Sequence, residues 1–146
     1  MTGLVATKST TVRFVDTNVL LYSISTDARE SAKAERARDL LTARDLGLSV
    51  QVLQEFFVQA TRPSRSDRLD HDVAAGLVEA FQRFPVQPTT VGVMAAALET
   101  CRRFQLSYWD AAVIEAAREL GCDVVLSEDL SHGQEFDGVR VVDPFS

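Results

Sequence analysis

The sequence contains few of the residues on which several common scaffolds and sites depend. Among its 146 residues are two cysteines, two histidines and two lysines. Cys101 and Cys122 lack the spacing of a metal-binding motif, so we expect buried thiols in a reducing compartment. The longest apolar run, Val93 to Leu98, is far shorter than the roughly 20 residues of a membrane-spanning helix, and no apolar block of signal-peptide length opens the chain. These absences predict a cytoplasmic protein without a membrane anchor.

Positive charge is also scarce. Fifteen basic residues face twenty-one acidic ones, which gives a formal net charge of −6. A protein that binds a polyanion through a broad positive face usually carries the opposite sign. Any nucleic acid must therefore be bound locally, by a few arginines or through cations. Arg62, Arg65 and Arg68, around Pro63, are the candidates for RNA phosphates, although a solvated polar loop explains the same cluster.

Composition and patterning predict one α/β domain over residues 1–146, with residues 1–11 as a candidate flexible extension. Apolar residues make up 46% and charged residues 25%, and no linker or repeat divides the chain. Short β-branched runs alternate with helical patterns, which predicts a three-layer α/β/α sandwich with a mainly parallel sheet. The expected strands lie at 11–16, 47–50, 86–88, 123–127 and 139–142, and the expected helices at 28–46, 52–62, 73–84, 90–104 and 107–120.

Four acidic residues fall where a site is expected in such a sheet, because ligands bind at the carboxyl ends of parallel strands. Asp16 ends the first strand, and Asp129 follows the strand that ends at Ser127. Asp110 lies at a helix start, which reaches the same edge if that helix runs antiparallel to the strands. Glu55 borders the apolar face of its helix.

Each of these acids also has a structural interpretation. Asp16 could cap a short helix, Asp110 could complete a capping box with Ser107, Asp129 could serve a turn, and Glu55 could lie on the surface. Converging carboxylates would repel one another unless cations were bound, and hard oxygen ligands suit Mg²⁺ or Mn²⁺. With no lysine, histidine pair or cysteine nearby, the chemistry would come from a metal-activated water.

The order of these motifs resembles that of the PIN-domain nucleases. The resemblance is carried by Asp16-Thr-Asn-Val-Leu, by Glu55 in a helix, by Asp110 after Tyr-Trp and by Ser127-Glu-Asp129. It extends from about residue 12 to residue 145, and the chain length is similar to that of the toxins of VapBC-type toxin–antitoxin pairs. The resemblance implies an α/β/α domain and a Mg²⁺- or Mn²⁺-dependent endoribonuclease. It also implies inhibition by an antitoxin, with the toxin usually a homodimer.

The resemblance also implies roles for individual residues. Asp16, Glu55, Asp110 and Asp129 match the four acidic positions of the family. Asp16 and Asp110 would hold the metal most directly, with Asp129 close to it and Glu55 acting through water. Two polar positions, Asn18 and Ser127, would orient these acids. Glu128 and Asp137 remain alternatives to Asp129 as a ligand.

Other functional classes fit the sequence less well. A haloacid-dehalogenase-type Mg²⁺-dependent phosphatase needs an aspartate where this chain has Asn18, and a phosphoacceptor receiver needs a lysine in its C-terminal half. A metal-free ribonuclease would need His71 and His132 to meet. A non-catalytic RNA- or protein-binding module remains if the four acids are structural. Tyr108 and Trp109 could stack on a base, but core packing is favoured for the tryptophan.

Overall fold

The computed structural model describes residues 11–146, so the extension predicted over residues 1–11 lies outside the described residues except for Thr11. A six-stranded sheet in the order β3-β2-β1-β4-β6-β5 forms the centre of the fold. All neighbouring strands are parallel except the pair β5 and β6. The mainly parallel sheet is confirmed. The strands are β1 (Arg13–Val15), β2 (Leu46–Ser49), β3 (Val86–Gln87), β4 (Val124–Leu126), β5 (Glu135–Phe136) and β6 (Val139–Val142).

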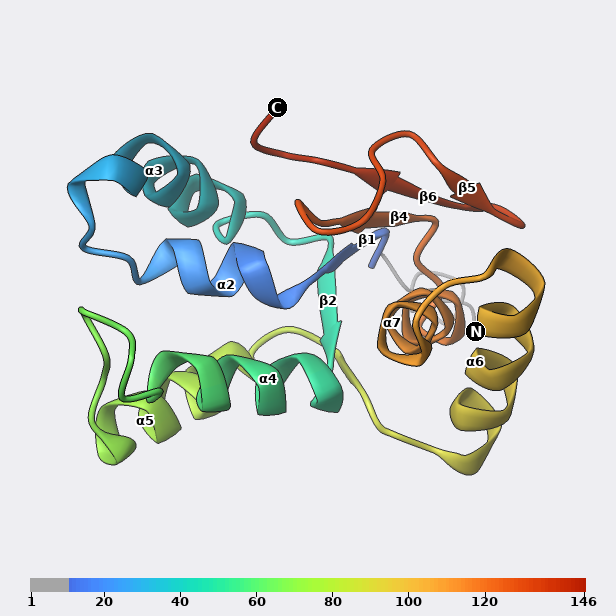
Figure 1. The fold of residues 1–146 in the computed structure, drawn as a ribbon, viewed down its shortest axis with the longest axis horizontal. Coiled ribbons are helices and arrows are strands. Elements are labelled where there is room, and N and C mark those ends of the chain that lie inside the picture. The colour runs from blue at the N-terminus through green and yellow to red at the C-terminus, as the bar shows by residue number, and fades with distance from the viewer. Residues whose placement is uncertain (1–10) are drawn as a thin grey trace, which may run out of the picture.

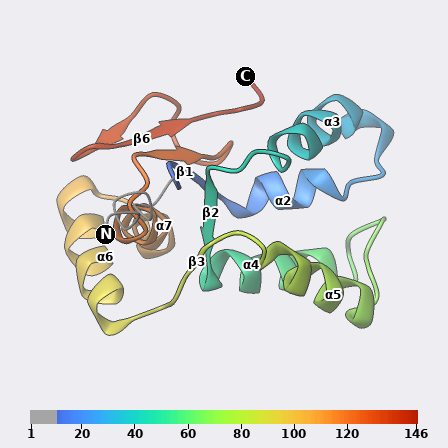
Figure 2. The ribbon, with the colours of Figure 1, turned by 180° about the vertical axis from the view of Figure 1, so that it is seen from behind.

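Helices lie on both sides of this sheet. Figures 1 and 2 show α2 to α5 on one side and α6 and α7 on the other. None of the helices within residues 11–146 has the length and hydropathy that crossing a bilayer requires. The helices are α2 (Thr17–Ser23), the short 3₁₀ helix η1 (Ala28–Glu30), α3 (Ser31–Leu40), α4 (Val50–Ala60), α5 (His71–Phe81), α6 (Val91–Phe104) and α7 (Tyr108–Glu119).

Local capping signals explain where several helices begin and end. The hydroxyl of Thr90 accepts a hydrogen bond from the backbone N–H of Val93, and that of Ser107 accepts one from Asp110. Each bond satisfies an N–H group that has no partner inside the helix. Gly121 follows α7 with a φ of +89°, a left-handed conformation that glycine adopts without strain. The helix starts expected at residues 90 and 107 are confirmed.

The structure departs from the predicted elements at two places. The helix predicted over 28–46 is wrong at its end, because α3 stops at Leu40. The chain must turn there so that Leu46 can pair with Arg13 in the sheet. Asp45 secures the turn, since its backbone carbonyl accepts from Arg13 N and its carboxylate pairs with the Arg13 guanidinium at 2.8 Å. Strand β5 was not predicted, because it is an antiparallel edge strand of two residues.

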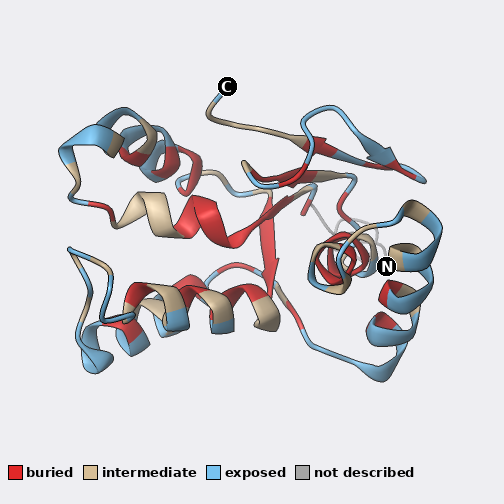
Figure 3. Ribbon diagram, in the orientation of Figure 1, coloured by how far each residue is buried: buried red, intermediate tan, exposed pale blue. Residues whose placement is uncertain are grey.

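The core holds the strand ends in place from both sides. Figure 3 shows buried residues along β1, β2 and β4, at the start of α2 and through α7. Phe14 in β1, Phe56 in α4 and Phe136 in β5 are the largest of the fully buried side chains. Phe56 also packs edge-on against Phe81 of α5. The carboxyl edge of the sheet therefore rests on well-packed elements, as a precise polar site requires.

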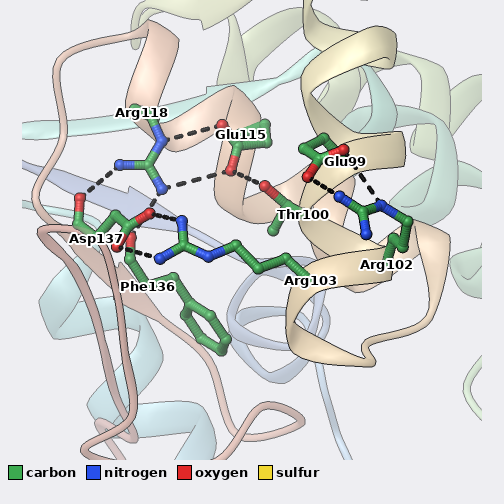
Figure 4. Close-up of polar contacts among 8 residues, drawn as sticks. All are labelled: Glu99, Thr100, Arg102, Arg103, Glu115, Arg118, Phe136 and Asp137. Atoms are coloured by element: carbon green, nitrogen blue, oxygen red, sulfur yellow. Dashed lines mark hydrogen bonds and ion pairs between the residues drawn. The ribbon is translucent and has the colours of Figure 1, made fainter.

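An ionic network fixes the far end of α7 (Figure 4). The buried Glu115 of α7 accepts from Arg118 at 2.9 Å and from Thr100 of α6 at 2.8 Å. Arg118 also donates to the carbonyl oxygens of Phe136 and Asp137, each at 2.7 Å. The network joins α6, α7 and the turn between β5 and β6, so it supports the helix that carries Asp110.

Candidate active site

The four predicted acidic residues line one pocket at the carboxyl edge of the sheet. Asp16, Glu55, Asp110 and Asp129 come from four separate parts of the chain and border a hollow of about 150 Å³. No lysine, arginine or histidine of residues 11–146 belongs to its lining. The pocket therefore collects negative charge with no basic side chain to compensate it.

Asp16 is the most buried of the four. Its side chain caps α2 by accepting a hydrogen bond from Thr17 N at Oδ1, over 2.8 Å, and Oδ2 accepts from the hydroxyl of Ser127 at 2.7 Å. The pKa of Asp16 is raised to about 6. Burial is the largest cause, the hydrogen bonds from Ser127 and Thr17 oppose it, and the charges of Asp129 and Glu55 add to it. Asp16 thus serves as a helix cap and as a pocket carboxylate at once.

Asn18 and Ser127 connect the ends of β1 and β4. Strand register places Val15 beside Leu126, so the residues that follow each strand are neighbours. Asn18 Nδ2 donates to Ser127 Oγ and to Asp129 Oδ2, both at 3.2 Å. Ser127 Oγ in turn accepts from Asp129 N at 3.1 Å. Both side chains therefore orient pocket carboxylates, in the positions that the sequence indicated.

The two alternatives to Asp129 lie elsewhere. Glu128 does not line the acidic pocket, because its carboxylate accepts hydrogen bonds from Tyr22 Oη and Lys33 Nζ. Asp137 pairs with Arg103 at the turn between β5 and β6, away from the pocket lining (Figure 4). Of the three acids, the structure brings only Asp129 to the site.

Glu55 and Asp110 reach the pocket from helices α4 and α7. Glu55 is half-buried and accepts from Thr17 Oγ1 at 3.3 Å and from Gln51 Nε2 at 3.4 Å. Asp110 receives the Ser107 cap on its backbone N–H, but its carboxylate makes no hydrogen bond within residues 11–146. The Asp110 side chain is therefore free for chemistry in the pocket.

Other pocket residues were not predicted, and Trp109 was predicted wrongly. Gln51 and Gln59 line the pocket from α4, and their spacing of four residues from Glu55 could have indicated a shared helix face. Trp109 lies on the pocket rim and is 62% exposed, so the expected core packing is wrong. Gln51 Nε2 donates to the Trp109 carbonyl at 3.4 Å.

The three candidate RNA-binding arginines lie in different environments. Arg62 and Arg68 are exposed, whereas Arg65 lines an open pocket of about 300 Å³ that shares Asn18 and Asp129 with the acidic pocket. Arg65 Nε lies 2.9 Å from a carboxylate oxygen of Asp67, which anchors the loop. Only Arg65 of the three thus borders the site.

Neither histidine lines the acidic pocket. His71 packs edge-on against Phe57, with ring centroids 5.2 Å apart, and His132 Nδ1 accepts from Asp143 N at 2.9 Å. Both rings therefore have structural partners, which leaves the two-imidazole mechanism without support.

The chemistry of the pocket fits a divalent cation. Within residues 11–146, the structure contains no group of three or more histidine, cysteine or acidic side chains close enough together to hold a metal ion. The donors nevertheless are carboxylate oxygens, which Mg²⁺ and Mn²⁺ prefer. Ionised carboxylates also repel one another unless a positive charge intervenes, and the lining within residues 11–146 supplies none.

Comparisons with known proteins agree with this geometry. The model of the PIN domain family matches residues 13–134. VapC20 of Mycobacterium tuberculosis, described as a toxin that cleaves the sarcin–ricin loop, has a TM-score of 0.62 at 22% identity and covers 80% of this chain and 91% of its own. DNA-bound VapBC from Salmonella typhimurium has a TM-score of 0.65 at 19% identity and covers 92% of this chain and 98% of its own. A toxin–antitoxin complex from Klebsiella pneumoniae has a TM-score of 0.63 at 16% identity, with 90% and 97% covered. No curated protein matches the chain.

Proposed function

The chain belongs to the PIN domain family, and from that premise we propose that it is a metal-dependent endoribonuclease that acts as the toxin of a toxin–antitoxin pair. The observation that carries the proposal is the pocket of four carboxylates without a basic side chain from residues 11–146. The toxins and toxin–antitoxin complexes among the similar structures support it.

Asp16, Asp110, Asp129 and Glu55 would hold Mg²⁺ or Mn²⁺ through their carboxylates. Such an ion lowers the pKa of a bound water and stabilises negative charge on phosphate oxygens. The chain's own residues keep the ligands in position. Asn18 and Ser127 aim Asp129 and Asp16 into the pocket.

Substrate phosphates need further positive charge, and we propose that Arg65 provides it beside the site. Its Nε pairs with Asp67, but its two terminal nitrogens make no hydrogen bond within residues 11–146. Arg65 lines an open pocket that shares Asn18 and Asp129 with the acidic one. A guanidinium with free N–H groups is well suited to a phosphate on the same strand as the scissile bond.

The ends of the RNA products test the reaction class. In the proposed reaction a water oxygen bonds to phosphorus, and the bond from phosphorus to the 3′ oxygen breaks. That oxygen leaves with a proton, so we expect 5′-phosphate and 3′-hydroxyl ends, detected by mass spectrometry of the fragments.

A different result would change the assignment. Primary products with 2′,3′-cyclic phosphates would mean that the substrate's own 2′-hydroxyl attacks, as in metal-free ribonucleases. Release of inorganic phosphate from 5′-phosphorylated RNA, without internal cleavage, would favour the Mg²⁺-dependent phosphatase instead.

Two exposed apolar surfaces support protein partners. The first is a groove of about 650 Å³ between α4 and α5, lined mainly by Val50, Leu53, Phe57, Val58 and Val78. A concave groove suits a narrow chain segment, so we propose that the antitoxin occupies it and inserts a basic side chain into the acidic pocket.

The second surface is the α6 stripe, formed by Val91, Met94 and Leu98. These three side chains are 78%, 43% and 53% exposed. Their spacing places them along one face of α6, and such a ridge can meet its own copy about a two-fold axis. We propose that this stripe forms the homodimer.

Antitoxin binding should depend on the groove. We expect expression of the protein alone to arrest growth and co-expression of the small protein encoded beside it to restore growth. Val58→Asp introduces a charge into the apolar groove and should weaken antitoxin binding at least about tenfold in calorimetry, because burying an unpaired charge costs more than the roughly 1.4 kcal/mol that corresponds to a factor of ten. Val73→Asp is the matched control, since Val73 is 51% exposed but does not line the groove. Equal losses in both variants would place the antitoxin elsewhere.

A further inference from the structure

The proposed hydrolysis leaves one conspicuous side chain without a role. Trp109 is the sole tryptophan of the chain. Its side chain is 62% exposed at the start of α7, directly before Asp110. Tryptophan is one of the most apolar side chains, and an indole is usually well buried. An exposed indole beside an acidic pocket therefore indicates a surface that a ligand covers.

A second hollow is also lined by this indole. Trp109 and Gln51 line both the acidic pocket and the second hollow, so the two are neighbours. The second hollow also contains the amides of Gln54 and Gln87 and the ring of Tyr108. None of the residues of the described chain that line it is charged.

Hydrogen-bonding groups remain available in this hollow. Gln87 is largely buried, and its Nε2 donates to the Pro88 carbonyl at 3.2 Å. Its Oε1 accepts no hydrogen bond within residues 11–146, and neither the Gln54 amide nor the Tyr108 hydroxyl has a partner there. The hollow thus offers donors and acceptors but no charge.

Flat rings, free amides and the absence of charge together suit a nucleobase. A phosphate would find no cation here, and an aliphatic protein segment would leave the amides without partners. Resting on the proposed function, we propose that Trp109 stacks on an unpaired RNA base next to the scissile phosphate, with the amides of Gln51, Gln54 and Gln87 facing the base edge. The hollow measures only about 60 Å³, so the base lies against the indole rather than inside a closed pocket.

This arrangement defines the class of substrate. A base can leave its neighbours and lie on an aromatic ring only where the RNA is single-stranded, in a loop, a bulge or an open strand. The same sequence held in a perfect duplex is a poor ligand for Trp109. The chain's net charge of −6 adds to this preference, because it opposes binding that depends on the phosphate backbone alone.

Fluorescence can test the stacking directly, because emission from a single tryptophan reports on Trp109 alone. We would titrate the Asp16→Asn protein, which preserves the RNA, with a short single-stranded oligoribonucleotide of mixed sequence. We expect quenched emission and protection of the indole from iodide. An abasic oligonucleotide of the same length should leave the emission of Trp109 unchanged. A perfect duplex of the same sequence should also leave it unchanged. Emission that already changes on dilution of the protein alone would mean that a second copy covers Trp109, and it would overturn the proposal.

Kinetics on the parent background give an independent test. Trp109→Leu removes the ring, and loss of base stacking should raise KM for single-stranded RNA about 5- to 150-fold with little change in kcat. Trp109→Phe keeps a ring and should restore most of the affinity. Val73→Ala is the matched control, since Val73 is 51% exposed on α5 and does not line the hollow. If the parent cleaves RNA and Trp109→Leu leaves KM unchanged, the stacking proposal fails alone. If the parent cleaves no RNA, the proposed function fails.

Discussion

Replacing Asp16 by asparagine is expected to lower RNA cleavage by more than about 100-fold without weakening the fold. Loss of a group that merely supports a metal ligand costs about 10- to 100-fold, so loss of a ligand itself should cost more. The substitution keeps the shape of the side chain, and asparagine caps a helix about as well as aspartate. The Oδ1 atom that accepts from Thr17 N is retained. We therefore expect this variant to lose its cleavage activity while it keeps its fold.

The stability of Asp16→Asn should depend on pH in a defined direction. Burial raises the pKa of Asp16 to about 6, so the folded state holds the proton more tightly than the unfolded state. The ionised group therefore destabilises the fold above about pH 6, and this penalty disappears as the pH falls below about 4. Without metal at pH 7, Asp16→Asn should be more stable than the parent by up to about 2–3 kcal/mol in urea unfolding. At pH 3, below both pKa values, the two proteins should be nearly equally stable.

Variants at the other acids complete this test. We expect Asp110→Asn to be as damaging as Asp16→Asn, Asp129→Asn to be severe and Glu55→Gln to be the mildest. Asp27→Asn is the matched control, because Asp27 caps η1 by accepting from Arg29 N and does not line the pocket. Asp137→Asn should also retain activity. Near-normal cleavage by correctly folded Asp16→Asn would overturn the whole site assignment.

Removal of divalent cations is expected to abolish cleavage. Four carboxylates without a basic neighbour supply no positive charge to lower the pKa of a water or to hold a phosphate, so EDTA should stop the reaction and Mg²⁺ or Mn²⁺ should restore it. A cation that binds only the folded state also stabilises it, by about 2.7 kcal/mol at a hundred times its Kd. We therefore expect thermal unfolding of the parent to shift upward by several degrees. Calcium should stabilise the fold while supporting little turnover, because its coordination is looser.

The same experiment on Asp16→Asn controls for non-specific effects of the salt. This variant has lost one carboxylate, so its unfolding temperature should respond far less to Mg²⁺ than that of the parent. Full cleavage after thorough chelation would contradict metal dependence. Equal stabilisation of both proteins would place the cation outside the acidic pocket.

Local signals in the sequence predicted most of the fold. The caps at Thr90 and Ser107 and the glycine at 121 mark helix boundaries through bonds to near neighbours in the chain. The end of α3 at Leu40 depends instead on the pairing of Leu46 with Arg13, more than thirty residues away. Strand β5 has only two residues, too few for any alternation of apolar and polar side chains to indicate a strand.

The candidate site, like the fold, depends partly on local signals and partly on contacts between residues that are distant in the chain. Asp16 and Asp129 could be expected together because both follow strands of one parallel sheet. The choice between Asp129 and its neighbour Glu128 depends on Lys33, which lies 95 residues from Glu128 and holds its carboxylate away from the pocket. The exposure of Trp109 could not be predicted from the sequence either. The packing of α6 against α7 buries the small residues Ala97, Ala111 and Ala112 and leaves the indole outside.

The strand order also determines when the site can form during translation. Strand β4 lies in the middle of the sheet, between β1 and β6, although it is among the last elements to be synthesised. The hydroxyl of Ser127 donates a hydrogen bond to Asp16, and Ser127 lies 111 residues after Asp16 in the chain. At about 5–20 residues per second, the ribosome makes Asp16 roughly 5–20 s before its partner exists. By the end of that interval the nascent chain carries Asp16, Glu55 and Asp110 but neither Ser127 nor Asp129, so any activity of this pocket begins only as elongation nears its end.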